Sequence, residues 1–231
     1  MRLPGWGFLK QVARPGRRAE PISGQFQTYS HTLPDRYPWL FQFAAAQLEA
    51  HSPLNLLSFG CSRGDEVFAL RSHFPTAQIK GIDVDPENIA QCEQRSRQQG
   101  AAGMRFSTAA TTAAEPASSY DAIFCVAVLC LGDLTTSGAQ HSDPHLHFVD
   151  FEAVVTDFAR CLKPSGLLLL HTTNFRFSDT SVAKDFDTLL EADPEQMAPD
   201  VQFDRDNRVL PGPRYRAVAF RKRAAAASAP A

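Results

Sequence analysis

The residues with the clearest chemical potential lie in a short glycine-bearing segment, residues 56–66, which reads LLSFGCSRGDE. The apolar run before Gly60 predicts a buried strand, and the residues from Asp65 onward predict a helix. Gly60 and Gly64 allow the connecting loop to turn sharply and to approach a ligand closely, because glycine has no Cβ. The free N–H groups at the start of the helix favour a carboxylate. Many strand–helix loops contain glycines for steric reasons alone, so this pattern by itself does not specify a ligand.

An acidic residue closes the next predicted strand. Asp83 lies in the segment KGIDVDP, about 20 positions after Gly64, the offset at which an acid meets ribose hydroxyls in nucleotide-binding strand–helix–strand units. A carboxylate at this point accepts hydrogen bonds from both hydroxyls. The alternative is that Asp83 caps a helix or lies on the surface, but Asp85 already stands in the capping position before Pro86. We therefore predict that Asp83 binds a ribose.

Strand and helix patterns alternate along the chain and predict the elements that carry these residues. Apolar runs predict five strands, with helices between them. Two further β-rich runs near the end, separated by turn residues, predict an antiparallel pair. The predicted fold class is α/β: a Rossmann-like, mainly parallel seven-stranded sheet flanked by helices, with an antiparallel C-terminal strand pair. The predicted strands are residues 54–59, 78–82, 104–107, 122–126, 167–170, 201–203 and 215–220, and the predicted helices are residues 36–50, 65–74, 86–98 and 148–162.

Length and composition predict one main domain with short appendages. We expect an N-terminal arm and helix over residues 1–50, the main domain over residues 51–223 and a disordered alanine-rich tail over residues 224–231. A net charge of −2 argues against broad electrostatic recruitment of nucleic acid. The sequence has no run of about 18 apolar residues and no signal peptide, and its five cysteines lack metal-ligand spacing. We therefore expect a cytoplasmic protein.

Four segments in order resemble the successive motifs of class I S-adenosylmethionine-dependent methyltransferases: LLSFGCSRG, GIDVDPENIA, YDAIFCVAVL and FARCLKPSGLLLL. The fourth motif of that family typically reads LKPGG, and here Ser165 replaces its first glycine. The resemblance covers residues 54–173. It implies that residues 51–223 bind S-adenosylmethionine as the cofactor, and that the methyl group passes to an unidentified acceptor by direct in-line displacement.

The resemblance also implies which residues contact the cofactor. Asp83 would bind the ribose and Val84 would touch the adenine. The family often has an acid after its third strand beside the adenine, and here Thr108 and Ala109 stand in that place. Val126, at the tip of the fourth predicted strand, would face the reactive methyl group. The glycine-bearing segment would line the methionine moiety with Gly60, Cys61, Ser62 and Gly64.

The acceptor side of the site is less defined. Open α/β sheets bind ligands at the carboxyl ends of their strands, so His147, His171 and Asn174 are predicted to face the substrate. For His171 the alternative is a structural hydrogen bond to the backbone. No catalytic base is assigned, because an activated sulfonium needs one only when the acceptor arrives protonated. The histidines of the loop before residue 148 lack carboxylate or cysteine partners, so no metal is predicted.

The near-neutral charge favours a small-molecule acceptor over RNA or a protein, without excluding either, and nothing in the sequence indicates an oligomeric state. The N-terminal arm has two readings: a lid that partly covers the cofactor cleft and shapes the acceptor pocket, or an arm packed passively over the core. The aromatic residues on which the lid reading rests are Phe26, Tyr29, His31, Tyr37 and Trp39.

Three other functions are compatible with parts of the pattern. A methyltransferase-like scaffold that binds a partner without catalysis would keep the same glycines and Asp83. A NAD-dependent oxidoreductase usually has G-x-G-x-x-G, whereas Ser62 stands here in place of the middle glycine. An α/β-hydrolase would use Ser62 in a G-x-S-x-G turn, but that fold needs several strands before the turn, and only an arm and one predicted helix precede residue 54.

Overall fold

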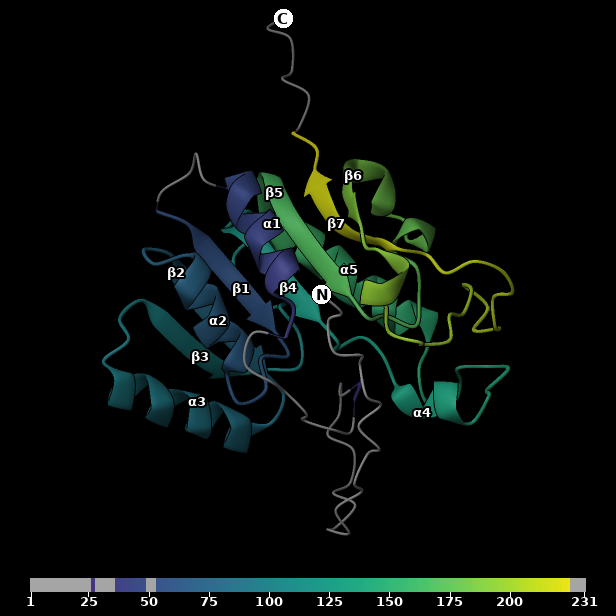
Figure 1. Ribbon diagram of the computed structural model, residues 1–231, viewed down its shortest axis with the longest axis horizontal. Helices are drawn as coiled ribbons and strands as arrows, with labels where there is room; N and C mark the ends of the chain where they lie inside the picture. The colour runs from purple at the N-terminus through teal and green to yellow at the C-terminus, as the bar shows by residue number, and fades with distance from the viewer. Residues whose placement is uncertain (1–25, 28–35, 49–52, 225–231) are drawn as a thin grey trace, which may run out of the picture.

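A single seven-stranded sheet organises the part of the chain that the computed structural model describes, residues 26–27, 36–48 and 53–224 (Figure 1). The strand order is β3-β2-β1-β4-β5-β7-β6. Strands β1 to β5 are mutually parallel, whereas β7 runs antiparallel to both β5 and β6. The strands are β1 (Asn55–Phe59), β2 (Gln78–Asp83), β3 (Met104–Thr108), β4 (Tyr120–Val126), β5 (Leu162–His171), β6 (Phe186–Glu191) and β7 (Ala217–Lys222).

Helices cover both faces of the sheet, and each face has its own apolar core. Helices α1 (Pro38–Leu48), α2 (Asp65–His73) and α3 (Pro86–Gln99) bury apolar side chains against one face. Helix α5 (Phe148–Cys161) covers the other face, and the short α4 (Gly132–Thr136) follows β4. Between β5 and β7 the chain forms three 3-10 turns in addition to β6: Phe177–Asp179, Ala183–Asp185 and Pro194–Gln196.

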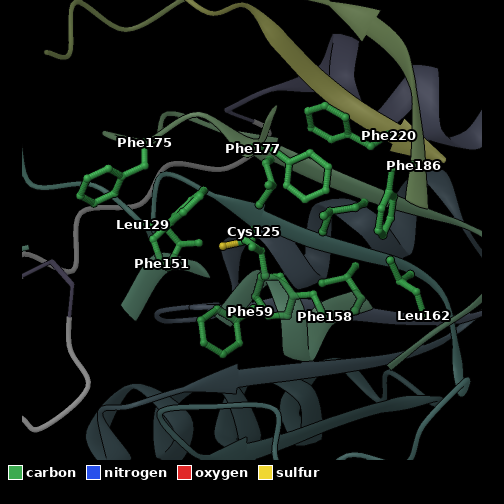
Figure 2. Close-up of a cluster of buried hydrophobic side chains, with 14 of the residues drawn as sticks. Phe59, Cys125, Leu129, Phe151, Phe158, Leu162, Phe175, Phe177, Phe186 and Phe220 are labelled. Carbon is green, nitrogen blue, oxygen red and sulfur yellow. The ribbon is translucent and has the colours of Figure 1, made fainter. Parts of the chain in front are cut away.

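Aromatic side chains dominate the core beneath α5 (Figure 2). Phe158 of α5 packs edge-to-face on Phe59 of β1, with ring centroids 5.0 Å apart. Phe177 lies 5.2 Å from Phe186 of β6 and 4.4 Å from Phe220 of β7. These contacts attach the antiparallel edge of the sheet to the turns that follow β5, so the irregular C-terminal segment is held by buried rings.

The helix ends follow the capping chemistry of the sequence in one case and depart from it in another. Helix α3 begins as the sequence predicts, because the Asp85 carboxylate accepts a hydrogen bond of 2.8 Å from the Glu87 N–H and Pro86 occupies the first turn. Helix α2 instead begins after Gly64, in the left-handed conformation with φ 88°, and no side chain caps it. Ser62 lies three residues before Asp65, a spacing that fits an N-cap arrangement, but no such cap forms.

The predicted fold class is confirmed, and one predicted strand is wrong. Residues 201–203 form no strand; Phe203 makes only isolated bridges and is fully buried as an anchor in the core. The edge strand is β6, in which Phe186 alone is buried. Because β6 buries only Phe186, its sequence shows no alternation of apolar and polar residues. The apolar side chain of Phe203, which is buried in an irregular segment, gave residues 201–203 the sequence pattern of a short strand.

Several predictions on domain organisation fall on residues 1–25, 28–35, 49–52 and 225–231, which lie outside the described residues. These include most of the predicted arm, with Tyr29 and His31, and nearly all of the predicted tail. The division into arm, main domain and tail therefore stays a prediction. No helix among the described residues is long and apolar enough to cross a membrane.

Replacing Phe158 with alanine should lower the free energy of unfolding by about 3–5 kcal/mol, because a fully buried ring is removed from a packed core. The matched control is Val149→Ala on the same helix, since Val149 is 68% exposed and its loss should cost less than about 0.5 kcal/mol. Urea unfolding of both variants measures the difference. Equal costs for the two would contradict the described burial of α5.

Candidate cofactor and acceptor site

The strand order reverses between β1 and β4, which creates a topological switch point at the carboxyl ends of these two strands. From β1 the chain continues outward to β2 and β3, and it then returns to build β4 and β5 on the opposite side of β1. Open α/β sheets bind ligands where the strand order reverses in this way. The loop of residues 60–64 leaves β1 at this edge, and Val126 ends β4 beside it. The fold therefore brings the two predicted cofactor segments to one edge of the sheet.

The Asp83 carboxylate ties the loop after β1 to the end of β2. Its Oδ2 atom accepts a hydrogen bond of 2.7 Å from the Ser62 N–H, and its Oδ1 atom accepts hydrogen bonds from the Asp85 N–H at 2.9 Å and from Asn88 Nδ2 at 3.0 Å. Two more loop N–H groups bond to the carbonyl that precedes Asp83. Asp83 is only 8% exposed, so the acid predicted to meet a ribose also fixes the conformation of the glycine-bearing loop.

Two glycines of the loop leave no room for a side chain. Gly60 has φ 71°, and a Cβ there would lie 2.5 Å from Cγ2 of Val128. Gly64 has φ 88°, and a Cβ there would lie 3.0 Å from the Cys92 sulfur. Both positions therefore require glycine for conformation and for space. The sequence predicted a close approach to a ligand at these glycines, whereas their missing Cβ atoms face Val128 after β4 and Cys92 of α3.

Cys61 is part of a buried thiol pair beneath this loop. Cys61 and Cys92 both direct their Sγ atoms toward the Ser62 carbonyl, at 3.7 Å and 3.2 Å. The hydrogen bond with Cys92, together with burial, raises the pKa of the Cys61 thiol well above its usual value. A neutral thiol is a weak nucleophile, so Cys61 supports the loop by packing rather than by covalent chemistry.

The remaining predicted cofactor residues lie next to Asp83 and at the tip of β4. Thr108 pairs in register with Asp83 across β2 and β3, and the Ala109 N–H donates to the Asp83 carbonyl at 2.9 Å. Val84 is half-buried directly after Asp83. Val126 is 9% exposed. The carboxyl ends of β1, β2, β3 and β4 thus supply all nine predicted positions along one edge.

His171 and Asn174, predicted to face the substrate, are buried at the end of β5. The Asn174 side chain accepts from the Leu131 N–H at 2.6 Å and donates to the Val201 carbonyl at 2.7 Å, so both ends of its amide hold loops together. His171 Nε2 lies 3.1 Å from the Gln196 carbonyl, and burial lowers the pKa of His171 to about 4. His171 is therefore neutral at physiological pH. Contact of either side chain with an acceptor stays a prediction.

His147 lies in a different setting. It is half-buried at the start of α5 and makes no side-chain cap, and the N–H of the next residue is capped instead by Asn207 Oδ1 at 2.7 Å. Its predicted role on the acceptor side also stays a prediction. Among the described residues, no group of three or more His, Cys, Asp or Glu side chains is arranged to hold a metal ion.

Three adjacent central strands end in a non-glycine residue with left-handed backbone conformation. Ser62 follows β1 with φ 48°, Ala127 follows β4 with φ 57°, and Thr172 follows β5 with φ 59°. The Ala127 N–H donates to the His171 carbonyl at 2.8 Å, which links the ends of β4 and β5. Strained conformations of this kind concentrate at ligand-binding sites. Their position agrees with a site along this edge.

A family model described as a methyltransferase domain matches residues 50–210, which is more than half of the chain. The chain belongs to this family. The predicted resemblance to the methyltransferases is thereby confirmed at the level of the family. No curated protein sequence matches the chain significantly.

Solved structures resemble this methyltransferase at low identity. The YcgJ protein from Bacillus subtilis is 20% identical over 69% of this chain and 55% of that chain, with a TM-score of 0.45. The PH0226 protein from Pyrococcus horikoshii is 16% identical over 60% and 58%, with a TM-score of 0.44. A geranyl diphosphate C-methyltransferase from Streptomyces coelicolor is 14% identical over 58% and 42%, with a TM-score of 0.43. The methyltransferase described here spans about half of the length of these structures.

The loop of the methyltransferase has features that fit the methionine end of its cofactor. The Ser62 hydroxyl is buried and has no hydrogen-bond partner among the described residues, which is costly unless a ligand supplies one. The same observation leaves Ser62 without the neighbouring base that the hydrolase reading requires. The carboxylate of Asp83 already accepts three hydrogen bonds, and two oxygens offer about four acceptor positions. One position therefore remains for a ribose hydroxyl, whereas the sequence predicted that the carboxylate accepts hydrogen bonds from both hydroxyls.

One residue that the sequence reasoning missed also points to the cofactor. Glu66, in the first turn of α2, hydrogen-bonds through Oε1 to Ser58 Oγ of β1 at 2.7 Å. Burial raises the pKa of Glu66 to about 7, although the hydrogen bond from Ser58 opposes this shift. None of the ion pairs among the described residues involves this carboxyl group. A carboxylic acid beside the glycine-bearing loop is thus available to a positively charged ligand group.

Gly60→Ala should both destabilise the methyltransferase and weaken its binding of S-adenosylhomocysteine, because the new Cβ has a left-handed φ and collides with Val128. The matched control is Gly138→Ala, where φ is 65° and the added Cβ meets nothing within 4 Å. The control should lower the free energy of unfolding only by the cost of placing alanine in the left-handed conformation, about 1–2 kcal/mol.

Urea unfolding and titration calorimetry measure both effects, and Val128→Ala in the Gly60→Ala background should recover part of the loss. Equal behaviour of Gly60→Ala and Gly138→Ala would contradict the close packing of the loop.

Proposed function

We propose that this methyltransferase transfers a methyl group from S-adenosylmethionine to a small-molecule acceptor by direct in-line displacement. The observation that carries the proposal is the 2.7 Å hydrogen bond from the Ser62 N–H to Asp83 Oδ2, because it joins the two predicted ends of one cofactor site. Positioning supplies much of the rate in such a reaction, since the sulfonium already activates the methyl group.

Each segment of the edge has a part in this proposal. The loop from Gly60 to Gly64 holds the methionine end, with the Ser62 hydroxyl as a free donor or acceptor. Asp83 binds the ribose, and Val84, Thr108 and Ala109 surround the adenine. Val126 and the strained Ala127 define the place of the methyl group at the end of β4. These residues bind and orient, and none of them transfers a proton.

We assign the α-ammonium of the methionine moiety to Glu66. An ammonium beside the Glu66 carboxyl group would keep it ionised and would provide the missing ion pair for a buried acid. The hydrogen bond from Ser58 holds the carboxyl group at the end of β1, where the glycine-bearing loop begins.

The N-terminal residues support a proposal on the acceptor side. Gln27 Nε2 donates to Cys130 Sγ at 2.8 Å, which places Gln27 against the loop after β4. The rings of Tyr37 and Trp39 lie 4.6 Å and 5.6 Å from His171. We propose that these residues shape the acceptor pocket. The cytoplasmic location remains part of the proposal and is supported by the five cysteines, all of which are free thiols.

Calorimetry with S-adenosylhomocysteine and with NAD tests the cofactor. We expect S-adenosylhomocysteine to bind and NAD not to bind, and Asp83→Ala should weaken binding at least tenfold, or about 1.4 kcal/mol. Asp187→Asn on the exposed face of β6 is the control and should leave affinity unchanged. Release of S-adenosylhomocysteine from S-adenosylmethionine in the presence of a low-mass cell extract separates an enzyme from a non-catalytic binding module. Binding of NAD alone would refute the assignment.

The affinity for S-adenosylhomocysteine should depend on pH through Glu66. Without ligand the pKa of Glu66 is about 7, so below that pH the acid must release a proton before it can pair with the ammonium. Affinity should therefore fall about tenfold between pH 8 and pH 6, with proton release on binding.

Glu66→Gln should weaken binding and should abolish both the pH dependence and the proton release. Calorimetry in two buffers of different ionisation enthalpy measures these effects. A variant with the same pH dependence as the wild type would show that Glu66 does not meet the ammonium.

A further inference from the structure

A second group of polar side chains lies beyond the end of β5, outside the cofactor residues assigned above. A small pocket opens there between β5, β7 and the segment of residues 197–202. The β5 and β7 residues that line it are apolar, and the segments beside these strands contribute polar side chains. The residues that matter here are Leu170, Thr172, Met197, Asp200, Tyr215 and Val218.

Asp200 is the unusual member of this pocket. Its Oδ2 atom is buried and has no hydrogen-bond partner among the described residues. The Thr135 hydroxyl hydrogen-bonds to the carboxylate and also accepts the Val201 N–H at 2.9 Å. A buried carboxylate oxygen without a donor is costly, and a ligand, an ordered water or a catalytic role can supply the missing partner.

The charges around Asp200 restrict the kind of ligand. Burial raises the pKa of Asp200 above its usual value, while the positive charges of Arg214 and Arg36 and the hydrogen bond from Thr135 oppose the shift. Tyr37 and Cys130 face the same carboxylate, and its charge contributes to the raised pKa of each. With two guanidinium groups already nearby, an additional ammonium is disfavoured. With a carboxylate in the pocket, an acidic ligand is also disfavoured.

A chain of hydrogen bonds connects the pocket to the end of β4. Tyr37 hydrogen-bonds to Thr172, whose hydroxyl lies 2.7 Å from His171 Nδ1. The His171 carbonyl in turn accepts the Ala127 N–H at 2.8 Å. The pocket therefore adjoins the strand end at which the proposed function locates the methyl group.

We propose that this pocket, whose volume of about 20 Å³ suits one hydroxyl-sized group, receives the nucleophilic hydroxyl group of a small-molecule acceptor, and that Asp200 is the catalytic base. The inference rests on the proposed function. As the hydroxyl oxygen forms its bond to the methyl carbon, the electron pair of the broken carbon–sulfur bond remains on sulfur. The hydroxyl proton passes to Asp200 Oδ2, and the products are a methyl ether and a neutral thioether.

The first test needs no acceptor. Asp200→Asn removes a buried charge, so it should raise the melting temperature by about 2–4 °C at pH 8. Because the folded state raises the pKa of Asp200, the wild type loses stability as pH rises through that pKa, and the gain of the variant should shrink toward pH 4. Asp187→Asn, on exposed β6, should show no such gain. If the variant is not more stable than the wild type at any pH, Asp200 is not an unpaired buried carboxylate.

The second test follows the methyl group. Wild type, radiolabelled S-adenosylmethionine and the low-mass fraction of a cell extract should give labelled product that releases methyl iodide in hydriodic acid and no methanol in base. Asp200→Asn should reduce the rate at least about a hundredfold while its affinity for S-adenosylhomocysteine stays within about threefold. Base-labile label, or label stable to both treatments, would overturn the hydroxyl assignment.

The outcomes separate this inference from the proposed function. Wild-type protein that binds no S-adenosylhomocysteine contradicts the proposed function itself. Protein that binds S-adenosylhomocysteine but transfers no label is a binding module, and the acceptor pocket is refuted with the catalysis. Label transfer that Asp200→Asn leaves unchanged refutes only the pocket.

Discussion

The hydrogen bonds of one carboxylate hold the cofactor edge together. Asp83 accepts the N–H groups of Ser62 and Asp85 and the amide of Asn88, so it joins the loop after β1, the end of β2 and the first turn of α3. Bonds to an ionised acceptor are about twice as strong as neutral ones, and three of them converge on a residue that is 8% exposed. The left-handed Ser62 is thereby held in place. Every other assignment at this edge depends on that fixed loop.

The two sides of the site are built differently. The cofactor side consists of parallel strand ends and short loops whose positions follow from the sheet. The acceptor side that we propose consists of the long segment between β5 and β7, which is held by single contacts of buried residues. Asn174 bonds to loops on both of its sides, the Phe203 ring is fully buried, and Asn207 caps α5. A rigid cofactor side combined with an irregular, individually anchored acceptor side allows one chemistry to be matched to a particular acceptor.

The sequence predicted the strand ends at which the proposed cofactor residues lie, because its signals there are local. Gly60, Gly64 and Asp83 stand at strand ends, where conformation and spacing are visible in a single stretch of chain. The edge strand β6 was missed because only Phe186 is buried in it, and residues 201–203 were mistaken for a strand because of the buried Phe203. Glu66 and Asp200 were not identified because their importance arises from burial by distant segments. The local sequence does not distinguish a buried acid in a helix or a loop from one exposed on the surface, because distant segments of the chain bury it.

The left-handed residues Ser62, Ala127 and Thr172 give the rim of the sheet a property of its own. Each would relax if glycine replaced it, and for a β-branched residue such as Thr172 the conformation is especially unfavourable. Replacement of any of these three residues by glycine would therefore be expected to increase the stability of the folded protein. The direction in which the chain leaves each central strand is thus set at a conformational cost of roughly 1–3 kcal/mol per residue.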